Sequence, residues 1–193
     1  MDILKKTLEN IKPAYQSAVA EARERLDNLA KPIYSLGKLE DIAAKMAGIT
    51  GKVYNKINKK CIIVMSADNG VVEEGVSSAP QSVTALLTEN MAKGILGVNV
   101  LADCAGSDVK VVDIGVKAKF SNPKIIDRKI AYGTNNIAEG PAMTREDAIK
   151  GIEIGIEMIE KLAEEGYDLI GTGELGIGNT TTSAAVVCAL SGL

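Results

Sequence analysis

The segment from Gly171 to Asn179 has the clearest potential for chemistry in this sequence. It contains four glycines and one charged residue, Glu174. Glycines allow backbone N–H groups to converge, and the positive end of a following helix can then hold a phosphate. A carboxylate beside a phosphate is costly unless it faces a developing cation, such as the carbon of a ribose under displacement, or a sugar hydroxyl. The pattern favours a phosphate and sugar site, and the alternative is a tight turn with Glu174 in solvent.

A second group of polar residues follows an apolar run earlier in the chain. Asp68, Asn69 and Gly70 come first, and Glu73 and Glu74 follow closely. Such a cluster can bind a ligand or a hard cation, since Mg²⁺ uses two carboxylates in many geometries. It is equally typical of a tight turn with solvated acids. The sequence leaves both interpretations open.

Several kinds of chemistry are excluded or weakly supported. The chain has no histidine, so imidazole bases and ligands are absent and acid–base work falls to carboxylates. There is no phosphate-binding GxxxxGK[ST] motif. Gly171, Gly173 and Gly176 match the dinucleotide pattern GxGxxG, but no acidic residue lies about 20 positions later within the sequence. An NAD-dependent oxidoreductase is therefore the weaker alternative.

Composition limits the partners and the location that we expect. A net charge of −3 offers no positive field for nucleic acid or an anionic membrane. No run approaches the roughly 18 apolar residues of a membrane span, and the first residues lack a signal-like apolar stretch. We therefore expect a cytoplasmic protein without nucleic-acid or membrane partners. Cys61, Cys104 and Cys188 lie far apart in apolar runs, which predicts buried reduced thiols.

The elements that must position these residues form two parts. Residues 1–50 show apolar residues at helix spacing, interrupted by Pro13 and Pro32, and predict an N-terminal helical segment. Residues 51–193 alternate short β-branched runs with glycine-rich turns and helical stretches, which predicts an α/β domain of βαβ units with a parallel sheet. Only three or four strands are apparent, so we expect this fold to be incomplete at its C-terminus.

Three strands and three helices are predicted in the second part. The strands are expected at Cys61–Met65, Val109–Ile114 and Tyr167–Ile170, with a further short apolar run at 124–130. The helices are expected at about 81–105, 144–165 and 180–190, the second starting with a Thr144–Asp147 capping box. Ligands bind at the carboxyl ends of parallel strands, so the turns named above lie where a site should be.

Six separated segments of the chain resemble one family, the nicotinate-nucleotide:dimethylbenzimidazole phosphoribosyltransferases of cobalamin lower-ligand synthesis. Six matches in the same order make chance similarity improbable. The segments are Lys31–Glu40, Ala67–Val71 with Glu74–Val76, Pro80 with Val83–Thr84, Val111–Gly115, Asn136–Arg145 and Gly173–Thr181.

The resemblance implies that residues 51–193 form a Rossmann-like α/β domain, with a parallel sheet and helices on both faces. It also implies a homodimeric enzyme that transfers phosphoribose from nicotinate mononucleotide to a benzimidazole nitrogen with inversion. The products are alpha-ribazole phosphate and nicotinate, and no metal or cofactor is expected. Glu174 would lie beside the ribose and nicotinate. The 5′-phosphate region would be bound by Gly173, Leu175, Gly176, Ile177, Gly178, Asn179 and Thr180, and the base pocket would be lined by Asp68, Asn69, Ala79, Pro80 and Leu87.

Three departures from the family pattern matter. Asn69 stands where relatives often have histidine, and Ala79 and Leu87 stand where some have serine and glutamine, so the pocket would be more apolar. No residue matches the glutamate that serves as the family's general base. Such a base contributes about 10²–10⁴-fold. We therefore expect an incomplete catalytic unit, completed by a missing C-terminal segment or a second chain. A non-catalytic nucleotide-binding module is the alternative.

Overall fold

The computed structural model describes residues 3–192, which divide into two compact units between Ile57 and Asn58. The first unit is helical and the second contains the sheet. The last helix of the first unit ends at Thr50, and the first strand of the second begins at Lys60. Within the described residues, no helix is both long and apolar enough to span a membrane.

The first unit consists of α1 (Ile3–Asn10), α2 (Gln16–Asp27) and α3 (Lys38–Thr50), which confirms the predicted helices. Small side chains allow α2 and α3 to pack closely. The buried residues at their contact are Ala18 and Ala22 from α2 and Ala44 and Ala47 from α3.

The second unit is built around a four-stranded parallel sheet with the order β3-β2-β1-β4, so the predicted fold class is confirmed. Its elements, in chain order, are β1 (Lys60–Ala67), the 3₁₀ helix η1 (Gly70–Glu74), α4 (Ser82–Lys93), α5 (Gly97–Cys104), β2 (Ser107–Gly115), β3 (Ile125–Asp127), α6 (Arg145–Glu164), β4 (Leu169–Leu175) and α7 (Asn179–Ser191).

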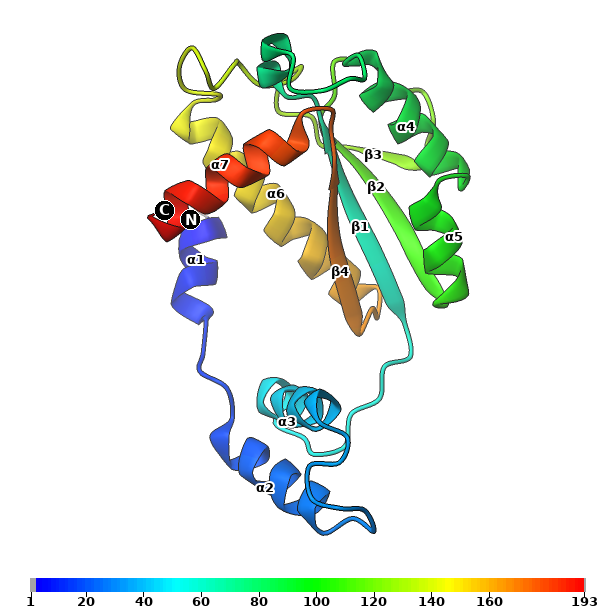
Figure 1. Cartoon of the computed structure of the whole chain (residues 1–193), viewed down its shortest axis with the longest axis vertical. Helices are drawn as coiled ribbons and strands as arrows, with labels where there is room; N and C mark the ends of the chain where they lie inside the picture. Colours follow the sequence, from blue (N-terminus) through cyan, green and yellow to red (C-terminus); the bar gives the residue numbers. More distant parts are fainter. Residues whose placement is uncertain (1–2, 193) are drawn as a thin grey trace. The chain divides into compact units, whose positions relative to one another are not determined.

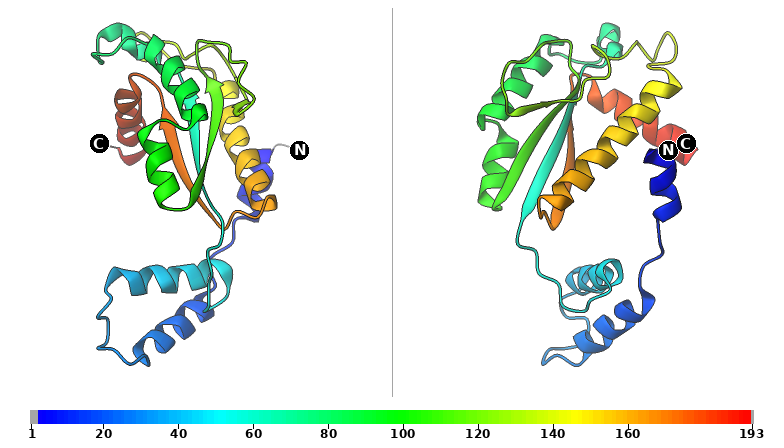
Figure 2. Two further views of the ribbon diagram at one scale, coloured as in Figure 1. Left: turned by 90° about the vertical axis from the view of Figure 1, so that its right-hand side faces the viewer. Right: turned by 180° about the vertical axis from the view of Figure 1, so that it is seen from behind.

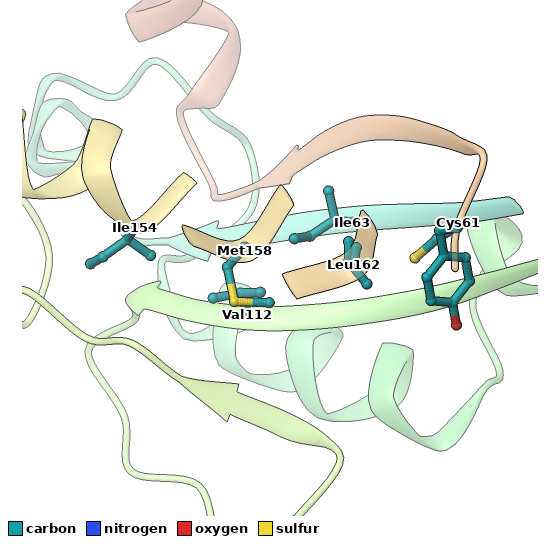
Figure 3. Packing of buried hydrophobic residues seen from close by; sticks show 7 residues of the cluster. Cys61, Ile63, Val112, Ile154, Met158 and Leu162 are labelled. Carbon is teal, nitrogen blue, oxygen red and sulfur yellow. The ribbon is translucent and has the colours of Figure 1, made fainter. Parts of the chain in front are cut away.

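Helices cover both faces of this sheet, with α6 on one side and α4 and α5 on the other (Figures 1 and 2). Strand alternation divides the core accordingly. Ile63 and Val112 pack with Met158 and other residues of α6 (Figure 3), whereas Val64 packs with Met91 of α4. Such a doubly covered sheet explains why the strands are almost continuously apolar in the sequence.

The structure corrects two predicted elements. The helical stretch 81–105 is two helices, because α4 ends at Gly94 in the left-handed conformation (φ +85°). The third strand does not end at Ile170: β4 continues to Leu175, and Gly171 and Gly173 pair with Ile62 and Val64 of β1. Glycine is common in turns, but here it lies in a strand beside bulky residues of its neighbour.

The three cysteines differ in their exposure, and the chain ends in a largely exposed helix. Only Cys61 is buried, and burial raises the pKa of its thiol. Cys104 and Cys188 are exposed, which corrects the expectation for both. The α7 helix confirms the predicted helix at 180–190, and its side chains from Ser183 to Ser191 are all exposed.

Candidate functional site

The candidate site lies where β1 and β4 end side by side. From β1 the chain proceeds to β2 and β3 on one side, whereas β4 lies on the other. This reversal of strand order is a topological switch point, where open parallel sheets bind ligands beyond the carboxyl ends of their strands. Ser66 of β1 pairs with Leu175 of β4 at this end. The turns after the two strands are therefore adjacent, and they contain parts of both predicted segments, residues 68–69 after β1 and residues 176–178 after β4.

The turn after β4 requires glycine at two positions. A Cβ on Gly176 would lie 2.0 Å from the Ala67 carbonyl oxygen, so no side chain fits there. Gly178 adopts φ +84° immediately before α7, a conformation that other residues rarely adopt. These glycines bring the first turn of α7 against the end of β1. The phosphate-binding turn suggested by the sequence is thus shorter than predicted and consists of residues 176–178.

Two side chains from other elements hold the middle of this turn. The Ile177 N–H donates to Thr84 Oγ1 of α4 at 3.0 Å. Asn69 Nδ2, from the turn after β1, donates to the Ile177 carbonyl oxygen at 3.1 Å. The single proton of the Thr182 hydroxyl of α7 is shared between Asn69 Oδ1 at 3.2 Å and the Asn179 carbonyl oxygen at 3.0 Å. Asn69 therefore connects the two turns with the start of α7.

Glu174 lies at the end of β4 with an exposed side chain. Asn179 Nδ2 donates to its Oε1 at 2.6 Å, which holds the carboxylate near the start of α7. Ile170 packs on the α6 side of the sheet and Leu175 on the α4 side. Because side chains alternate along a strand, Glu174 lies on the α6 side.

The strand position of Gly171 and Gly173 also bears on the dinucleotide hypothesis. In that fingerprint, the glycines form a tight turn against a pyrophosphate. Here Gly171 and Gly173 belong to β4 and only Gly176 lies in the turn. The GxGxxG match is therefore a coincidence of spacing, and Gly173 does not contribute a turn N–H as predicted.

The turn after β1 is fixed by a buried carboxylate. Asp68 is only 2% exposed, and its Oδ2 accepts a hydrogen bond from the Lys117 N–H at 2.7 Å. Its Oδ1 is buried without a hydrogen-bond partner. The Asp68 backbone also bonds to the Gly115 oxygen and the Thr134 N–H, each at 3.0 Å. Asp68 thus joins β1 to the end of β2 and to the loops that follow β2 and β3. Its burial excludes the alternative in which it is a solvated turn residue.

The other acids near this turn do not form a metal site with Asp68. Glu74 Oε1 accepts a hydrogen bond from Asn136 Nδ2 at 2.6 Å, and Glu73 lies exposed on η1. Among the described residues, no group of three or more cysteines, aspartates and glutamates is placed to hold a metal ion. Asp113 serves local structure in a similar way to Asp68, by accepting hydrogen bonds from the Gly115 and Val116 N–H groups.

The residues predicted to line a base pocket lie on the α4 side. Ala79 and Pro80 belong to the loop before α4, and Gln81 Nε2 donates to the Asn69 carbonyl oxygen at 3.0 Å. Leu87 is half-buried on α4, three residues beyond Thr84. The structure therefore brings Ala79 and Pro80 toward Asn69, but it places Glu174 on the opposite side of the sheet.

Sequence reasoning missed two residues that hold the site together. Thr84 is fully buried, and Gln81 links the loop before α4 to Asn69. A signal existed for Thr84, because Thr84 and Thr88 are polar residues one helical turn apart among apolar ones. No local pattern indicated that Thr84 would contact a turn more than ninety residues away.

A separate cavity lies on the α6 side, at the ends of β1 and β2. It has a volume of about 270 Å³ and is mainly apolar. Ala67, Gly115 and Gly151 are among its small lining residues, and Ala142 and Met143 come from the segment 136–145 that the sequence analysis singled out.

Comparisons with known proteins place the chain among relatives of one name. A family model described as "Phosphoribosyltransferase" matches residues 11–193. The chain is 56% identical over 191 residues to a nicotinate-nucleotide–dimethylbenzimidazole phosphoribosyltransferase of Clostridium tetani, covering 99% of this chain and 53% of that protein. It is 48% identical to the protein of that name from Geobacter metallireducens, over 100% of this chain and 55% of the relative.

A solved structure is also similar. The enzyme of that name from Thermus thermophilus superposes with a TM-score of 0.88 at 40% identity, over 92% of this chain and 54% of that chain. The chain thus spans about half the length of the relatives that it matches. On the extent of these matches, the chain belongs to the nicotinate-nucleotide–dimethylbenzimidazole phosphoribosyltransferase family.

Proposed function

We propose that this chain takes part in phosphoribosyl transfer from nicotinate mononucleotide to 5,6-dimethylbenzimidazole or a related base. The products are alpha-ribazole phosphate and nicotinate, used for assembly of the cobalamin nucleotide loop. The observation that best supports this function is the glycine turn 176–178, which lies at the switch point directly before α7. The names of the relatives support the same substrates.

The 5′-phosphate binds at the glycine turn and the first turn of α7. Backbone N–H groups at the start of a helix carry partial positive charge, which favours an anion. Gly176, Ile177 and Gly178 form the turn, and Asn179 and Thr180 begin the helix. Leu175 and Gly173 support this binding site from the strand and do not contribute turn donors.

Glu174 acts on the ribose side of the bound nucleotide. In the reaction, the bond between C1′ and the nicotinate nitrogen breaks, and its electron pair leaves with nicotinate. A benzimidazole nitrogen forms the new bond to C1′ from the opposite face. Positive charge that develops on the ribose is stabilised by a nearby carboxylate. Asn179 holds Glu174 in place by its 2.6 Å hydrogen bond.

The base binds on the α4 side of the switch point. Ala79, Pro80 and Leu87 offer it an apolar surface, and Asp68 and Asn69 lie at the end of the adjacent strand. The second benzimidazole nitrogen must lose its proton, and no residue of this chain matches the family's general base. The chain spans about half the length of its relatives, so we propose that this base comes from the part of the enzyme that the chain does not span.

The decisive experiment measures nicotinate release from nicotinate mononucleotide with dimethylbenzimidazole as acceptor. We expect little release by the 193-residue chain alone and faster release after addition of the remaining half of the Clostridium tetani relative. Glu174→Gln should lower kcat of the completed enzyme by about 10²-fold. The matched control is Glu164→Gln, an exposed acid at the end of α6. Nucleotide binding without release after completion would support the non-catalytic module instead.

The proposed enzyme is a cytoplasmic homodimer. Support for self-association comes from the first unit, where Ile33, Leu39, Ile42 and Ile49 are all exposed. Exposed apolar residues in such number are typical of an interaction surface. Light scattering after size-exclusion chromatography should show a dimer, and a monomer at micromolar concentration would contradict this part of the proposal.

A further inference from the structure

Both backbone polar groups of Ile177 are held by side chains from outside its own turn. Its N–H donates to Thr84 Oγ1 at 3.0 Å, and its carbonyl oxygen accepts from Asn69 Nδ2 at 3.1 Å. Turn residues commonly leave such groups to solvent. Two independent hydrogen bonds to one residue restrict rotation of the peptide units on both sides of it.

The two side chains that hold Ile177 are themselves fixed. Thr84 is fully buried, so its hydroxyl has little freedom to move. Asn69 Oδ1 accepts a hydrogen bond from the Thr182 hydroxyl. The Asn69 backbone carbonyl oxygen accepts another from Gln81 Nε2. The position of Ile177 is therefore set by α4 and by the turn after β1, and not by the glycine turn alone.

These contacts determine which backbone donors remain for an anion. The Ile177 N–H already donates a hydrogen bond to Thr84 Oγ1. The Asn179 N–H donates to the Gly176 oxygen at 2.9 Å, and the Thr180 N–H donates to Asn179 Oδ1 at 3.0 Å. Among residues 177–180, only the Gly178 N–H has no hydrogen bond within the described part of the protein. The Gly178 N–H and the Ile177 carbonyl form one planar peptide unit, so the direction of the N–H is set by the orientation of that carbonyl.

We propose that Thr84 is a positioning residue for phosphate recognition: it fixes the Gly176–Ile177 peptide unit, while Asn69 fixes the next unit, which carries the Gly178 N–H. Thr84 touches no substrate in this proposal. It works together with Asn69, which holds the other polar group of the same residue. The proposal rests on the proposed function, because that function supplies the phosphate-bearing nucleotide.

The test compares three threonine variants in the 193-residue chain. Thr84→Val keeps the shape but removes the acceptor, and Thr84→Ser keeps the acceptor. Thr88→Val is the matched control, because Thr88 is equally buried one helical turn away and its hydroxyl donates only to the Thr84 carbonyl oxygen, at 2.8 Å. Calorimetry gives the Kd of nicotinate mononucleotide, and nicotinate riboside serves as the ligand without a phosphate.

We expect Thr84→Val to raise the Kd of nicotinate mononucleotide by about fivefold to tenfold, which corresponds to the loss of one hydrogen bond. Thr84→Ser and Thr88→Val should stay within about twofold, and the riboside Kd should not change in any variant. Hydrogen exchange at the Ile177 amide should accelerate by about tenfold in Thr84→Val only.

Three results would overturn the proposal. An unchanged Kd in Thr84→Val, despite faster exchange at Ile177, would show that the contact is structural only. Equal weakening by Thr88→Val would indicate a general disturbance of α4. Failure of the unmodified chain to bind nicotinate mononucleotide or inorganic phosphate would instead refute the phosphate site itself, and with it the proposed function.

Discussion

The turns after β1 and β4 lie side by side, but they are built in different ways. The turn after β1 is held by Asp68. Its buried carboxylate accepts a hydrogen bond from the Lys117 N–H, and its backbone bonds to Gly115 and Thr134. The turn after β4 has no such carboxylate. It depends on two glycines and on the side chains of Asn69 and Thr84.

This difference indicates that the turn after β4 depends on residues of the turn after β1. The β1 turn can form with the central strands, because its partners are Gly115, the last residue of β2, and Lys117, two residues later. The β4 turn, by contrast, takes one of its hydrogen bonds from Asn69 in the turn after β1. We call the turn after β1 the platform and the turn after β4 the dependent turn. This pairing suits a site that must present backbone donors in one direction, since such donors stabilise charge best when they need not reorganise.

The largest expected effect comes from Gly176→Ala in the dependent turn. The new Cβ would lie 2.0 Å from the Ala67 carbonyl oxygen, in a strand that cannot easily move. We expect a loss of about 3 kcal/mol or more in the free energy of unfolding, measured in urea. Gly140→Ala is the control, since nothing lies within 4 Å and its effect should stay below about 0.5 kcal/mol. Equal stability of both variants would refute the close approach.

A smaller effect is expected from Gly70→Ala in the platform. Its Cβ would lie 2.4 Å from the backbone carbon of Asn135. Because Asn135 lies in a loop, the backbone can shift more readily, and we expect a loss of about 2 kcal/mol in the free energy of unfolding. If this variant is less stable than Gly176→Ala, the turn after β1 is the more constrained of the two.

Asp68→Ala tests the carboxylate that distinguishes the platform. It would leave the Lys117 N–H without its 2.7 Å acceptor, at a cost of about 1–3 kcal/mol in urea unfolding. Asp127→Ala provides the comparison, because the exposed Asp127 carboxylate accepts a similar bond from the Lys129 N–H at 3.1 Å. Water can replace that acceptor, so the loss should be below about 0.5 kcal/mol. Similar losses in both variants would show that burial of Asp68 is unimportant.

The smallest effect concerns the opposite end of β4. Hydrogen bonds from the Asn58 and Lys59 N–H groups lower the pKa of the Asp168 carboxyl. A lowered pKa in the folded state gives stability that is present above the ordinary value of about 4 and is lost as the pH falls through the lowered pKa. Urea midpoints should therefore fall less between pH 5 and pH 3 in Asp168→Asn than in the unmodified chain. Identical pH dependence would contradict the assignment.

Much of the architecture could be predicted because strand and helix patterns are local. The runs around Ile63 and Val112 indicated buried parallel strands, and the spacing in 144–165 indicated a helix with Thr144 at its N-cap, whose Oγ1 accepts from the Asp147 N–H. The end of β4 could not be predicted, because Gly171 and Gly173 resemble turn residues unless their pairing with β1 is known.

The sequence by itself indicated the parallel α/β class and the segment that carries the glycine turn, since spacing is a property of neighbouring residues, and the family followed from the resemblance of six ordered segments. Only the tertiary structure decided that Asp68 is buried and that Asn69 reaches Ile177 across a separation of 108 residues. Strand register and the placement of α4 set those contacts. They depend on how the whole sheet assembles, and no local pattern encodes them.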